Sequence, residues 1–322
     1  MFAPIEPFTS GHISVTDGHT IYWEASGNPH GQPALYLHGG PGGGIGAGYR
    51  RHFDPDRFLI VSFEQRGCGR SRPLAAESGA DLASNTTQTL LADTEALRVH
   101  LGIESWLLLG VSWGCTLALA YAQAHPERVD GIVLAAVNTT TRFEIDWLTE
   151  HMQAIFPREW AQFERASGRK PGQRLIDAYY ERILDPCPDV RAAAADAWCD
   201  WENVHVSLDP AFKPMPLFED PESRLNFATL VIHYWKHTGF IADGAIQTGM
   251  SRLAGIPGVL IHGRYDVSSP MLTAWNLHQA WPGSEFIVIA SEGHGGPEMF
   301  AEVERAIARI ATLRPTKSVD TA

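Results

Sequence analysis

Cysteine is scarce in this 322-residue chain, which has four: Cys68, Cys115, Cys187 and Cys199. No two of them have the Cys-x-x-Cys spacing of a metal or redox motif, and a protein of this size does not need disulfides for stability. We therefore expect reduced thiols, as in a cytoplasmic protein, and no metal site. Cys68 and Cys115 lie inside glycine-containing motifs, where either could line a pocket, although we expect small buried residues.

Basic charge is also low. The chain has 25 Lys and Arg residues against 37 Asp and Glu residues, which gives a formal net charge of -12. No Lys/Arg-rich segment interrupts the acidic balance to form a phosphate-binding face. We therefore expect no nucleic-acid partner.

Apolar runs of membrane-spanning length are lacking as well. The most apolar run, from Trp106 to Ala122, contains the turn Gly110 to Gly114. A short strand followed by a buried helix explains it better than a membrane span. The first eight residues lack the basic start and apolar stretch of a secretory signal, which favours a cytoplasmic location. The sequence carries no signal for an oligomeric state.

Short β-rich runs alternate with helical segments over the first third of the chain. The pattern predicts strands over 20–24, 34–37, 58–63 and 106–109, and helices over 87–100 and 113–125. Several of these strands are apolar throughout, as strands covered on both faces are. Strand-helix alternation of this kind indicates an α/β fold with a largely parallel sheet.

The alternation is interrupted in the middle of the chain. After a predicted strand over 131–137, residues 141–245 are helical, aromatic and charged in character. Strand-helix alternation then resumes with predicted elements over 259–262, 271–280 and 286–289 and a final amphipathic helix. We therefore predict a catalytic core formed by residues 1–140 and 246–322 and an inserted helical cap domain over 141–245.

The segment Gly110-Val111-Ser112-Trp113-Gly114 has the pattern Gly-x-Ser-x-Gly between a predicted strand and a predicted helix. In an α/β-hydrolase fold this context exposes a nucleophilic serine on a sharp turn. The helix N-terminus also places backbone N–H groups near the charge that develops during attack. We predict that Ser112 is the nucleophile; the alternative is a serine that merely forms a turn.

A serine that transfers acyl groups needs hydrogen-bond donors for the oxyanion. The glycine-rich loop His38 to Gly44 follows a predicted strand at the place such a loop occupies. We predict that the backbone amides of Gly40 and Trp113 form the oxyanion hole. A phosphate cradle is the alternative, but the loop lacks the Lys-Ser/Thr ending of a P-loop and the register of a dinucleotide site. No cofactor is therefore expected.

The base and the acid of a triad follow late strands in this fold, in the chain order Ser, acid, His. Asp266 follows the predicted strand over 259–262, and His294 follows that over 286–289. We predict that both reach the sheet edge where Ser112 emerges. Among the other histidines, we expect His262 to be a core or supporting residue, His233 to belong to the cap and His125 to end a helix.

Together these motifs resemble those of the proline iminopeptidases (prolyl aminopeptidases), and the likeness extends over nearly the whole chain. It rests on residues 38–44 (HGGPGGG), 65–71 (QRGCGRS), 112–114 (SWG), 117–123 (LALAYAQ), 262–266 (HGRYD) and 293–294 (GH). The resemblance implies an α/β-hydrolase with a helical cap that cleaves an N-terminal proline from small peptides.

The resemblance also implies substrate-binding residues in the cap. The segment Trp198-Cys-Asp-Trp201-Glu202 is similar to the family's Trp-x-x-Trp-Glu, whose glutamate is associated with the free amino end of the substrate. Glu202 would then recognise the amine, with Trp198 and Trp201 against an apolar ring; a solvated surface charge is the alternative. Arg142 matches a family position near the site, and pairing with a nearby acidic residue is its alternative.

The chain also departs from the family pattern. Val231 stands where the family has a second amine-binding glutamate, so one carboxylate anchor would be lost. Other departures are Glu64, Gln88, Thr89, Val111, Cys115 and Gly295. The triad positions all match, so most departures concern the pocket or its supports rather than the acyl-transfer chemistry.

We therefore predict a serine hydrolase that releases an N-terminal proline or small amino acid from peptides or aminoacyl amides through an acyl-enzyme on Ser112. The alternative is a related hydrolase of an ester or amide metabolite without a free amine, which Val231 favours. A ligand-binding protein without catalysis is a third hypothesis, but it has no chemical need for Ser112, Asp266 and His294 together.

Overall fold

The computed structural model describes residues 1–77, 80–206, 208, 213 and 216–313. One eight-stranded sheet lies at its centre. The strands are β1 (Thr9–Ser14), β2 (Thr20–Gly27), β3 (Gln32–Leu37), β4 (Phe58–Phe63), β5 (Trp106–Val111), β6 (Val129–Ala135), β7 (Gly258–Gly263) and β8 (Glu285–Ile289). Their order is β1-β2-β4-β3-β5-β6-β7-β8. The six strands from β4 to β8 in this order pair in parallel, whereas β2 pairs antiparallel with both β1 and β4.

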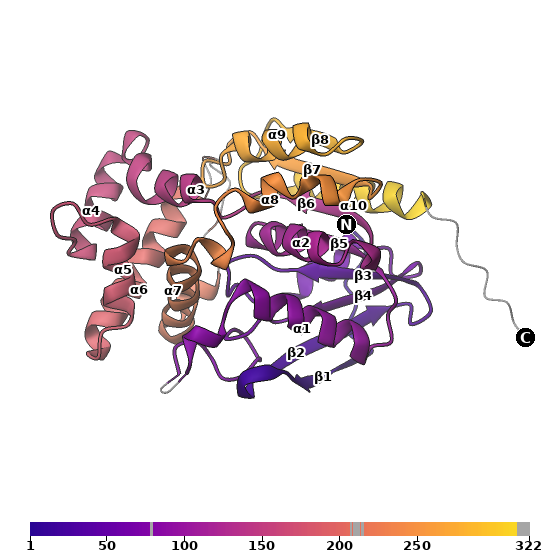
Figure 1. Ribbon diagram of the computed structural model, residues 1–322, viewed down its shortest axis with the longest axis horizontal. Helices are drawn as coiled ribbons and strands as arrows, with labels where there is room; N and C mark the ends of the chain where they lie inside the picture. Colours follow the sequence, from indigo (N-terminus) through magenta and orange to yellow (C-terminus); the bar gives the residue numbers. More distant parts are fainter. Residues whose placement is uncertain (78–79, 207, 209–212, 214–215, 314–322) are drawn as a thin grey trace, which may run out of the picture.

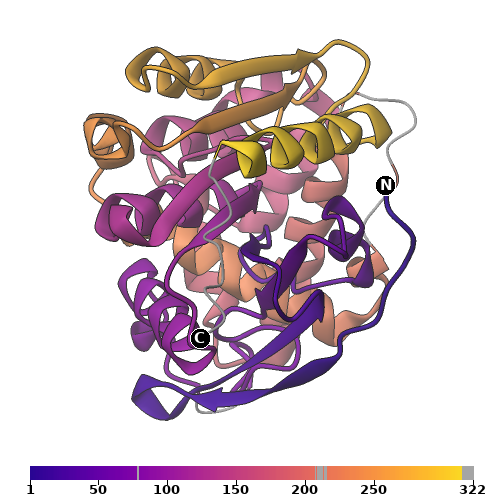
Figure 2. The same cartoon turned by 90° about the vertical axis from the view of Figure 1, so that its right-hand side faces the viewer.

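Helices cover both faces of the sheet and one of its ends (Figure 1). They are α1 (Thr87–His100), α2 (Trp113–Ala124), α3 (Arg142–Asp146), α4 (Pro157–Ser167), α5 (Leu175–Ile183), α6 (Pro188–His205), α7 (Pro221–Lys236), α8 (Ala245–Thr248), α9 (Met271–Ala280) and α10 (Pro297–Thr312). Buried residues of α1, α2 and α9 share a hydrophobic core with one face of the sheet. Residues of α10 form a second core on the other face (Figure 2).

The central strands explain why the sheet needs cover on both sides. Leu107, Leu108 and Leu109 of β5 are fully buried, and their side chains alternate between the two hydrophobic cores. A strand with apolar residues on both faces is stable only between two layers of helices. The α/β-hydrolase fold class predicted from the sequence is confirmed by this mostly parallel sheet and its flanking helices.

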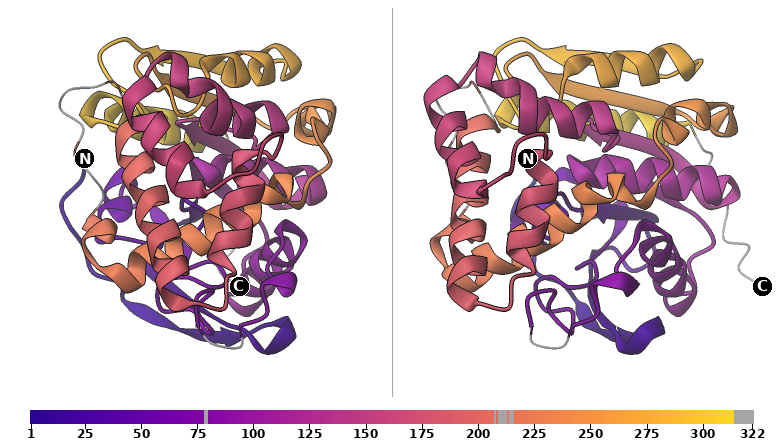
Figure 3. Two further views of the ribbon diagram at one scale, coloured as in Figure 1. Left: turned by 90° about the vertical axis from the view of Figure 1, so that its left-hand side faces the viewer. Right: turned by 60° about the vertical axis from the view of Figure 1, so that its left-hand side comes forward.

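The helices α3 to α7 lie between β6 and β7 in the chain and pack together beside the sheet (Figure 3). They have their own hydrophobic core, which includes Trp160, Phe163, Tyr179, Trp198 and Trp201. We call this group of helices the cap, and the domain limits of 141–245 remain our proposal. None of the helices in the described part of the chain has both the length and the apolar character needed to cross a membrane.

Strand β1 is absent from the elements that the sequence pattern predicts. It is an edge strand, and only one of its six residues is buried. The segment therefore lacks the apolar run or clear alternation that identifies a strand from sequence. Pairing with β2 determines its conformation instead.

The loop that follows β4 is fixed by a buried ion pair between Arg66 and Asp93. The Arg66 side chain is fully buried, and its Nε and Nη2 atoms donate to the two Asp93 oxygens over 2.5 and 2.8 Å. Nη1 and Nη2 also donate to Asp17 and Thr16. A buried guanidinium is stable only while its partners remain, so this pair holds the loop against α1.

We expect Asp93→Ala to lower the free energy of unfolding by about 3 to 5 kcal/mol, because it leaves the Arg66 charge buried without its main partner. Urea unfolding followed by circular dichroism measures this change. Asp196→Ala is the matched control, because Asp196 pairs with Arg224 but its side chain is 59% exposed. The control should change the unfolding free energy by less than about 1 kcal/mol. Equal effects of the two substitutions would contradict the prediction.

Candidate active site

Ser112 lies in a sharp turn between β5 and α2, with φ 56° and ψ -126°. Two glycines make this turn possible. A Cβ atom on Gly110 would lie 2.5 Å from the carbonyl oxygen of Gly114, and one on Gly114 would lie 2.0 Å from that of Leu37. No other residue fits at either place, so the helix approaches the sheet closely and Ser112 adopts the strained conformation of a nucleophile elbow.

Ser112, His294 and Asp266 form a continuous chain of contacts. Ser112 Oγ lies 2.9 Å from His294 Nε2, and His294 Nδ1 lies 2.8 Å from Asp266 Oδ2. Asp266 follows β7 and His294 follows β8, so the parallel strands bring both residues to the edge where Ser112 lies. The other Asp266 oxygen, Oδ1, accepts the backbone N–H of Ser269 over 2.9 Å. The carboxylate is thereby fixed in orientation.

Burial and pairing act in opposite directions on the pKa values of this site. Burial alone would lower the pKa of His294, but the carboxylate of Asp266, helped by that of Glu202, raises it above the usual value. Burial alone would raise the pKa of Asp266, but His294 holds it below the usual value. Asp266 therefore stays ionised, and His294 gains basicity from it.

Two other histidines have supporting positions. His262 is fully buried; its Nδ1 accepts the N–H of Val137 over 3.2 Å, and its Nε2 donates to the carbonyl oxygen of Ser269 over 2.8 Å. Burial lowers its pKa, so it is a neutral support for the loop of Asp266. His233 lies in α7, where its Nε2 contacts the Asn85 carbonyl oxygen over 2.9 Å.

A cavity of about 470 Å³ opens at Ser112 and His294, between the sheet edge and the cap. Its size is that of a small-molecule site. Its apolar lining residues are Ile145, Leu148, Val206, Phe227, Trp235 and Phe300. The carboxylate-bearing residues that line it are Glu144 and Glu202.

Gly40 and Trp113, predicted to form the oxyanion hole, lie next to Ser112. Gly40 lines the cavity, and Trp113 is the first residue of α2. Neither backbone amide donates to an acceptor in the described part of the chain. Their role as oxyanion donors remains a prediction.

Gln65, which the sequence analysis did not single out, joins the two segments that carry these amides. Its Oε1 accepts the indole N–H of Trp113 over 2.9 Å, and its Nε2 donates to the His38 carbonyl oxygen over 2.9 Å. Its backbone N–H also donates to His38 Nε2 over 3.1 Å. Gln65 thus fixes the glycine-rich loop relative to α2. Gln65 begins the motif of residues 65–71, two residues after the end of β4, and this motif is the sequence signal that could have indicated a role.

The two cysteines in the motifs are buried and do not line the cavity. Cys115 donates to the carbonyl oxygens of Gly110 and Ala135, both over 3.3 Å. Cys68 donates to the Gln65 carbonyl oxygen over 3.2 Å. Burial raises the pKa of both thiols well above the usual value. They are small packing residues that support the elbow and the loop.

Glu202 lines the cavity, and its side chain is 12% exposed. Trp198 Nε1 donates to Glu202 Oε1 over 3.1 Å. Burial raises the pKa of Glu202 to about 7, although the hydrogen bond from Trp198 and the proximity of His294 oppose this shift. The carboxylate is therefore poorly solvated and ready to pair with a cation.

Trp198, Trp201, Arg142 and Val231, which we predicted to be substrate-binding residues, are not among the described residues that line the cavity. Trp198 and Trp201 are buried in the cap core, where Trp201 stacks on Phe163 with ring centroids 5.1 Å apart. Val231 is fully buried in the same core. The Arg142 side chain is 60% exposed, and its Nε lies 3.5 Å from Asp146 Oδ2. Arg142 therefore forms the surface ion pair that we gave as the alternative.

The sequence matches the family of the alpha/beta hydrolase fold over residues 33–298. It is 42% identical over 311 residues to the proline iminopeptidase of Arabidopsis thaliana, a match that covers 96% of this chain and 80% of that protein. It is 43% identical over 299 residues to the probable proline iminopeptidase of Streptomyces coelicolor, covering 91% of this chain and 92% of that one. The chain belongs to the proline iminopeptidase family.

A solved structure of a proline iminopeptidase from Mycobacterium smegmatis matches with a TM-score of 0.62. The two sequences are 20% identical, and the match covers 95% of this chain and 99% of that one. At this identity the likeness shows a common fold. Membership of the proline iminopeptidases, predicted from the motifs, is confirmed by the relatives at higher identity.

We expect Gln65→Met to slow the labelling of Ser112 by a fluorophosphonate probe about tenfold to a hundredfold. The substitution keeps the side-chain length but removes both hydrogen bonds that align the two amides, and loss of one oxyanion donor outright costs about a hundredfold or more. The labelling rate is read from gel fluorescence over time. Gln88→Met is the control, because Gln88 is exposed and its side chain donates to the Phe240 carbonyl oxygen, away from the two amides. Labelling of Gln65→Met at the wild-type rate would contradict the role of Gln65.

Proposed function

We propose that this protein is a serine aminopeptidase that releases an N-terminal proline or small amino acid from peptides or aminoacyl amides. The observation that carries the proposal is that Glu202 and the Ser112–His294 pair line the same small cavity. A carboxylate at that place suits the free ammonium group of a substrate whose first carbonyl carbon lies at Ser112. We also propose that the protein acts in the cytoplasm, which agrees with its four free cysteines.

The geometry supports acyl transfer in two steps. His294 Nε2 takes the proton of Ser112 Oγ as the oxygen attacks the substrate carbonyl carbon. The amides of Gly40 and Trp113 receive the oxyanion, and His294 returns the proton to the leaving amine as the peptide bond breaks. Water then attacks the acyl-enzyme with His294 again as base, which releases the amino acid. Asp266 keeps the proton of neutral His294 on Nδ1 and stabilises the charged form.

Glu202 is better suited than Glu144 to recognise the amine. Glu144 Oε2 accepts the backbone N–H and the hydroxyl of both Thr139 and Thr141, at 2.7 to 3.3 Å. This carboxylate is therefore occupied in holding the start of α3. Glu202 has one described hydrogen bond, from Trp198, and retains free acceptor positions. The apolar residues of the cavity then contact the ring or side chain of the first amino acid.

The second candidate function is hydrolysis of an ester or amide without a free amine. The observation that favours it is the apolar character of α7 along the cavity. Phe227 and Trp235 line the cavity, and Val231, midway between them on the same face of the helix, is apolar as well. A second carboxylate is therefore missing from this wall.

We expect the wild-type protein to hydrolyse L-proline arylamide and Ser112→Ala to lose at least about a thousandfold in kcat, because the nucleophile is gone. Release of the chromogenic amine measures the rate. Ser251→Ala, on the exposed surface, is the control and should keep full activity. Faster turnover of N-acetylprolyl arylamide or of simple esters than of the free-amine substrate would favour the second candidate function instead.

We expect Glu202→Gln to lower kcat/KM for prolyl arylamide about tenfold to a hundredfold, because the ammonium loses a charge-assisted hydrogen bond. In the wild type, kcat/KM for this substrate should rise with pH through about 7, since the raised pKa leaves Glu202 largely protonated below that value. A simple ester requires only neutral His294, so its rate should survive the substitution. Its acid limb should move to lower pH, because Glu202 helps to raise the pKa of His294.

The matched control is Glu222→Gln, an exposed position at the start of α7. It should leave both pH profiles unchanged. Parallel losses on the amine substrate and the ester in Glu202→Gln would show that Glu202 supports the fold of the site rather than the amine.

A further inference from the structure

Three side chains of α6 lie on one face of the helix beside the cavity: Trp198, Glu202 and His205. Their spacing of four and three residues places them in a row along the helix. Trp198 Nε1 lies 3.1 Å from Glu202 Oε1, and His205 Nε2 lies 3.5 Å from Glu202 Oε2. Each carboxylate oxygen therefore has a ring nitrogen beside it, one from the preceding turn and one from the following turn.

The surroundings of His205 define its protonation state. Its side chain is 1% exposed, and its ring packs on Trp201 with centroids 5.3 Å apart. Its Nδ1 has no hydrogen-bond partner among the residues that the structure describes. Burial lowers the pKa of His205 to about 3, so the ring is neutral and carries one proton. The acceptor nearest to Nε2 among the described residues is Glu202 Oε2, at 3.5 Å, so we assign that proton to Nε2, and the lone pair of Nδ1 then has no partner among those residues.

A buried ring nitrogen without a partner has an energetic cost, so an apolar ring would suit this position better if packing were its only role. We propose that His205 is a positioning residue, which donates its Nε2 proton to Glu202 and with Trp198 fixes the carboxylate that receives the substrate amine. This inference rests on the proposed aminopeptidase function.

The arrangement also has a consequence for substrate choice. A carboxylate oxygen has two lone pairs, so a ring N–H on each oxygen leaves one acceptor position on each. A secondary ammonium, as in an N-terminal proline, has two N–H groups and fits these two positions. A primary ammonium has three and finds no third position on this carboxylate. A carboxylate held in this orientation thus satisfies both N–H groups of a prolyl substrate and leaves one N–H of a primary ammonium without a partner on it, which favours prolyl over other aminoacyl substrates.

His205→Asn and His205→Gln form the decisive pair of variants, because both side chains are polar but only Gln extends its amide nitrogen about as far as the imidazole Nε2. The rates of L-proline arylamide, L-alanine arylamide and a simple ester are compared for each. We expect His205→Asn to raise KM for the prolyl substrate about tenfold with little change in kcat, the size expected for one charge-assisted hydrogen bond. Its proline-to-alanine ratio of kcat/KM should fall several-fold. His205→Gln should keep both values close to wild type.

The ester reports on the fold and the triad, because its hydrolysis does not need Glu202. The variant His205→Phe keeps the ring volume but removes both nitrogens, so its melting temperature should be no lower than that of the wild type. Its KM for the prolyl substrate and its proline-to-alanine ratio of kcat/KM should match those of His205→Asn. If His205→Asn misfolds and loses ester activity, His205→Phe replaces it in the comparison. The role of His205 would be overturned if a folded Asn or Phe variant had the wild-type KM for the prolyl substrate and the wild-type proline-to-alanine ratio of kcat/KM. If the wild type cleaves the ester but not prolyl arylamide, the proposed function fails and this inference fails with it.

Discussion

The close approach of α2 to the ends of β3 and β5 is the constraint on which the site depends. At Gly114 the backbone lies so near the Leu37 carbonyl oxygen that no side chain fits, and the chain can pass from strand to helix by one path only. Ser112 then takes a positive φ, at a cost of about 1 to 3 kcal/mol that the buried surroundings must offset. Since the surroundings cannot relax, Ser112 Oγ has a fixed place, and the other groups are arranged around it.

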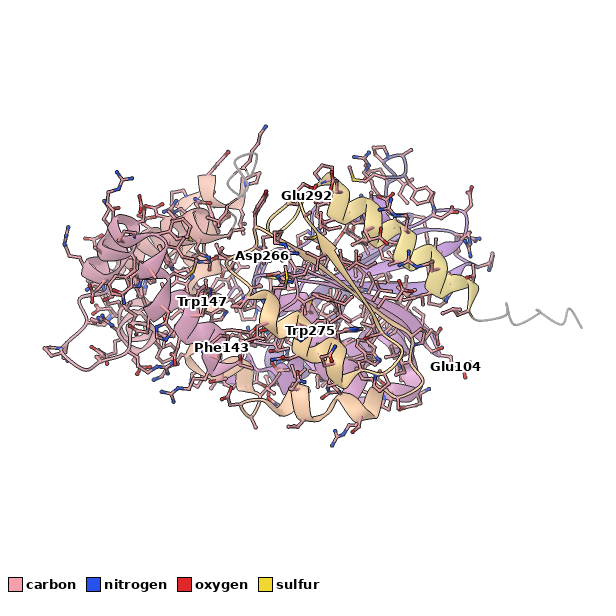
Figure 4. All side chains as sticks on the ribbon, turned by 90° about the horizontal axis from the view of Figure 1, so that it is seen from above. Glu104, Phe143, Trp147, Asp266, Trp275 and Glu292 are labelled. Atoms are coloured by element: carbon pink, nitrogen blue, oxygen red, sulfur yellow. The ribbon has the colours of Figure 1, made fainter. Side chains whose placement is uncertain are left out.

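The triad residues lie at the edge of the sheet, whereas Glu202, the carboxylate proposed to bind the amine, lies on the cap, which has its own hydrophobic core, so their relative position depends on how the cap meets the sheet. One direct link is the hydrogen bond from Trp147 Nε1 to the Val267 carbonyl oxygen, over 2.7 Å. Val267 follows Asp266 in the chain, and Figure 4 shows Trp147 and Asp266 at the border between the cap and the core. This bond ties a cap segment to the loop that orients His294. The distance between nucleophile and amine site is thereby coupled to the packing of the cap.

The sequence was sufficient to predict the turn of Ser112 and the positions of Asp266 and His294. Each of these residues follows an apolar strand, and parallel strands end at the same edge of the sheet. Family spacing identified the Trp198–Glu202 segment, but not which side of α6 faces the cavity. Of these residues only Glu202 lines the cavity; Trp198, one turn before it on the same face of α6, and Trp201 are buried in the cap core. The hydrogen bonds of Gln65 join segments that only tertiary packing brings together, and the role proposed for His205 depends on its burial in the cap, so helix and strand patterns alone did not predict either role.

Dehydration has two opposite effects on Glu202. It strengthens the attraction between the carboxylate and an ammonium, and it also disfavours the ionised form while no substrate ammonium is bound, in line with the raised pKa of about 7. A positively charged substrate reverses the second effect, because the ammonium stabilises the ionised carboxylate that binds it. Substrate binding and ionisation of Glu202 are therefore linked. In place of water, the ring N–H donors of Trp198 and His205 surround the carboxylate.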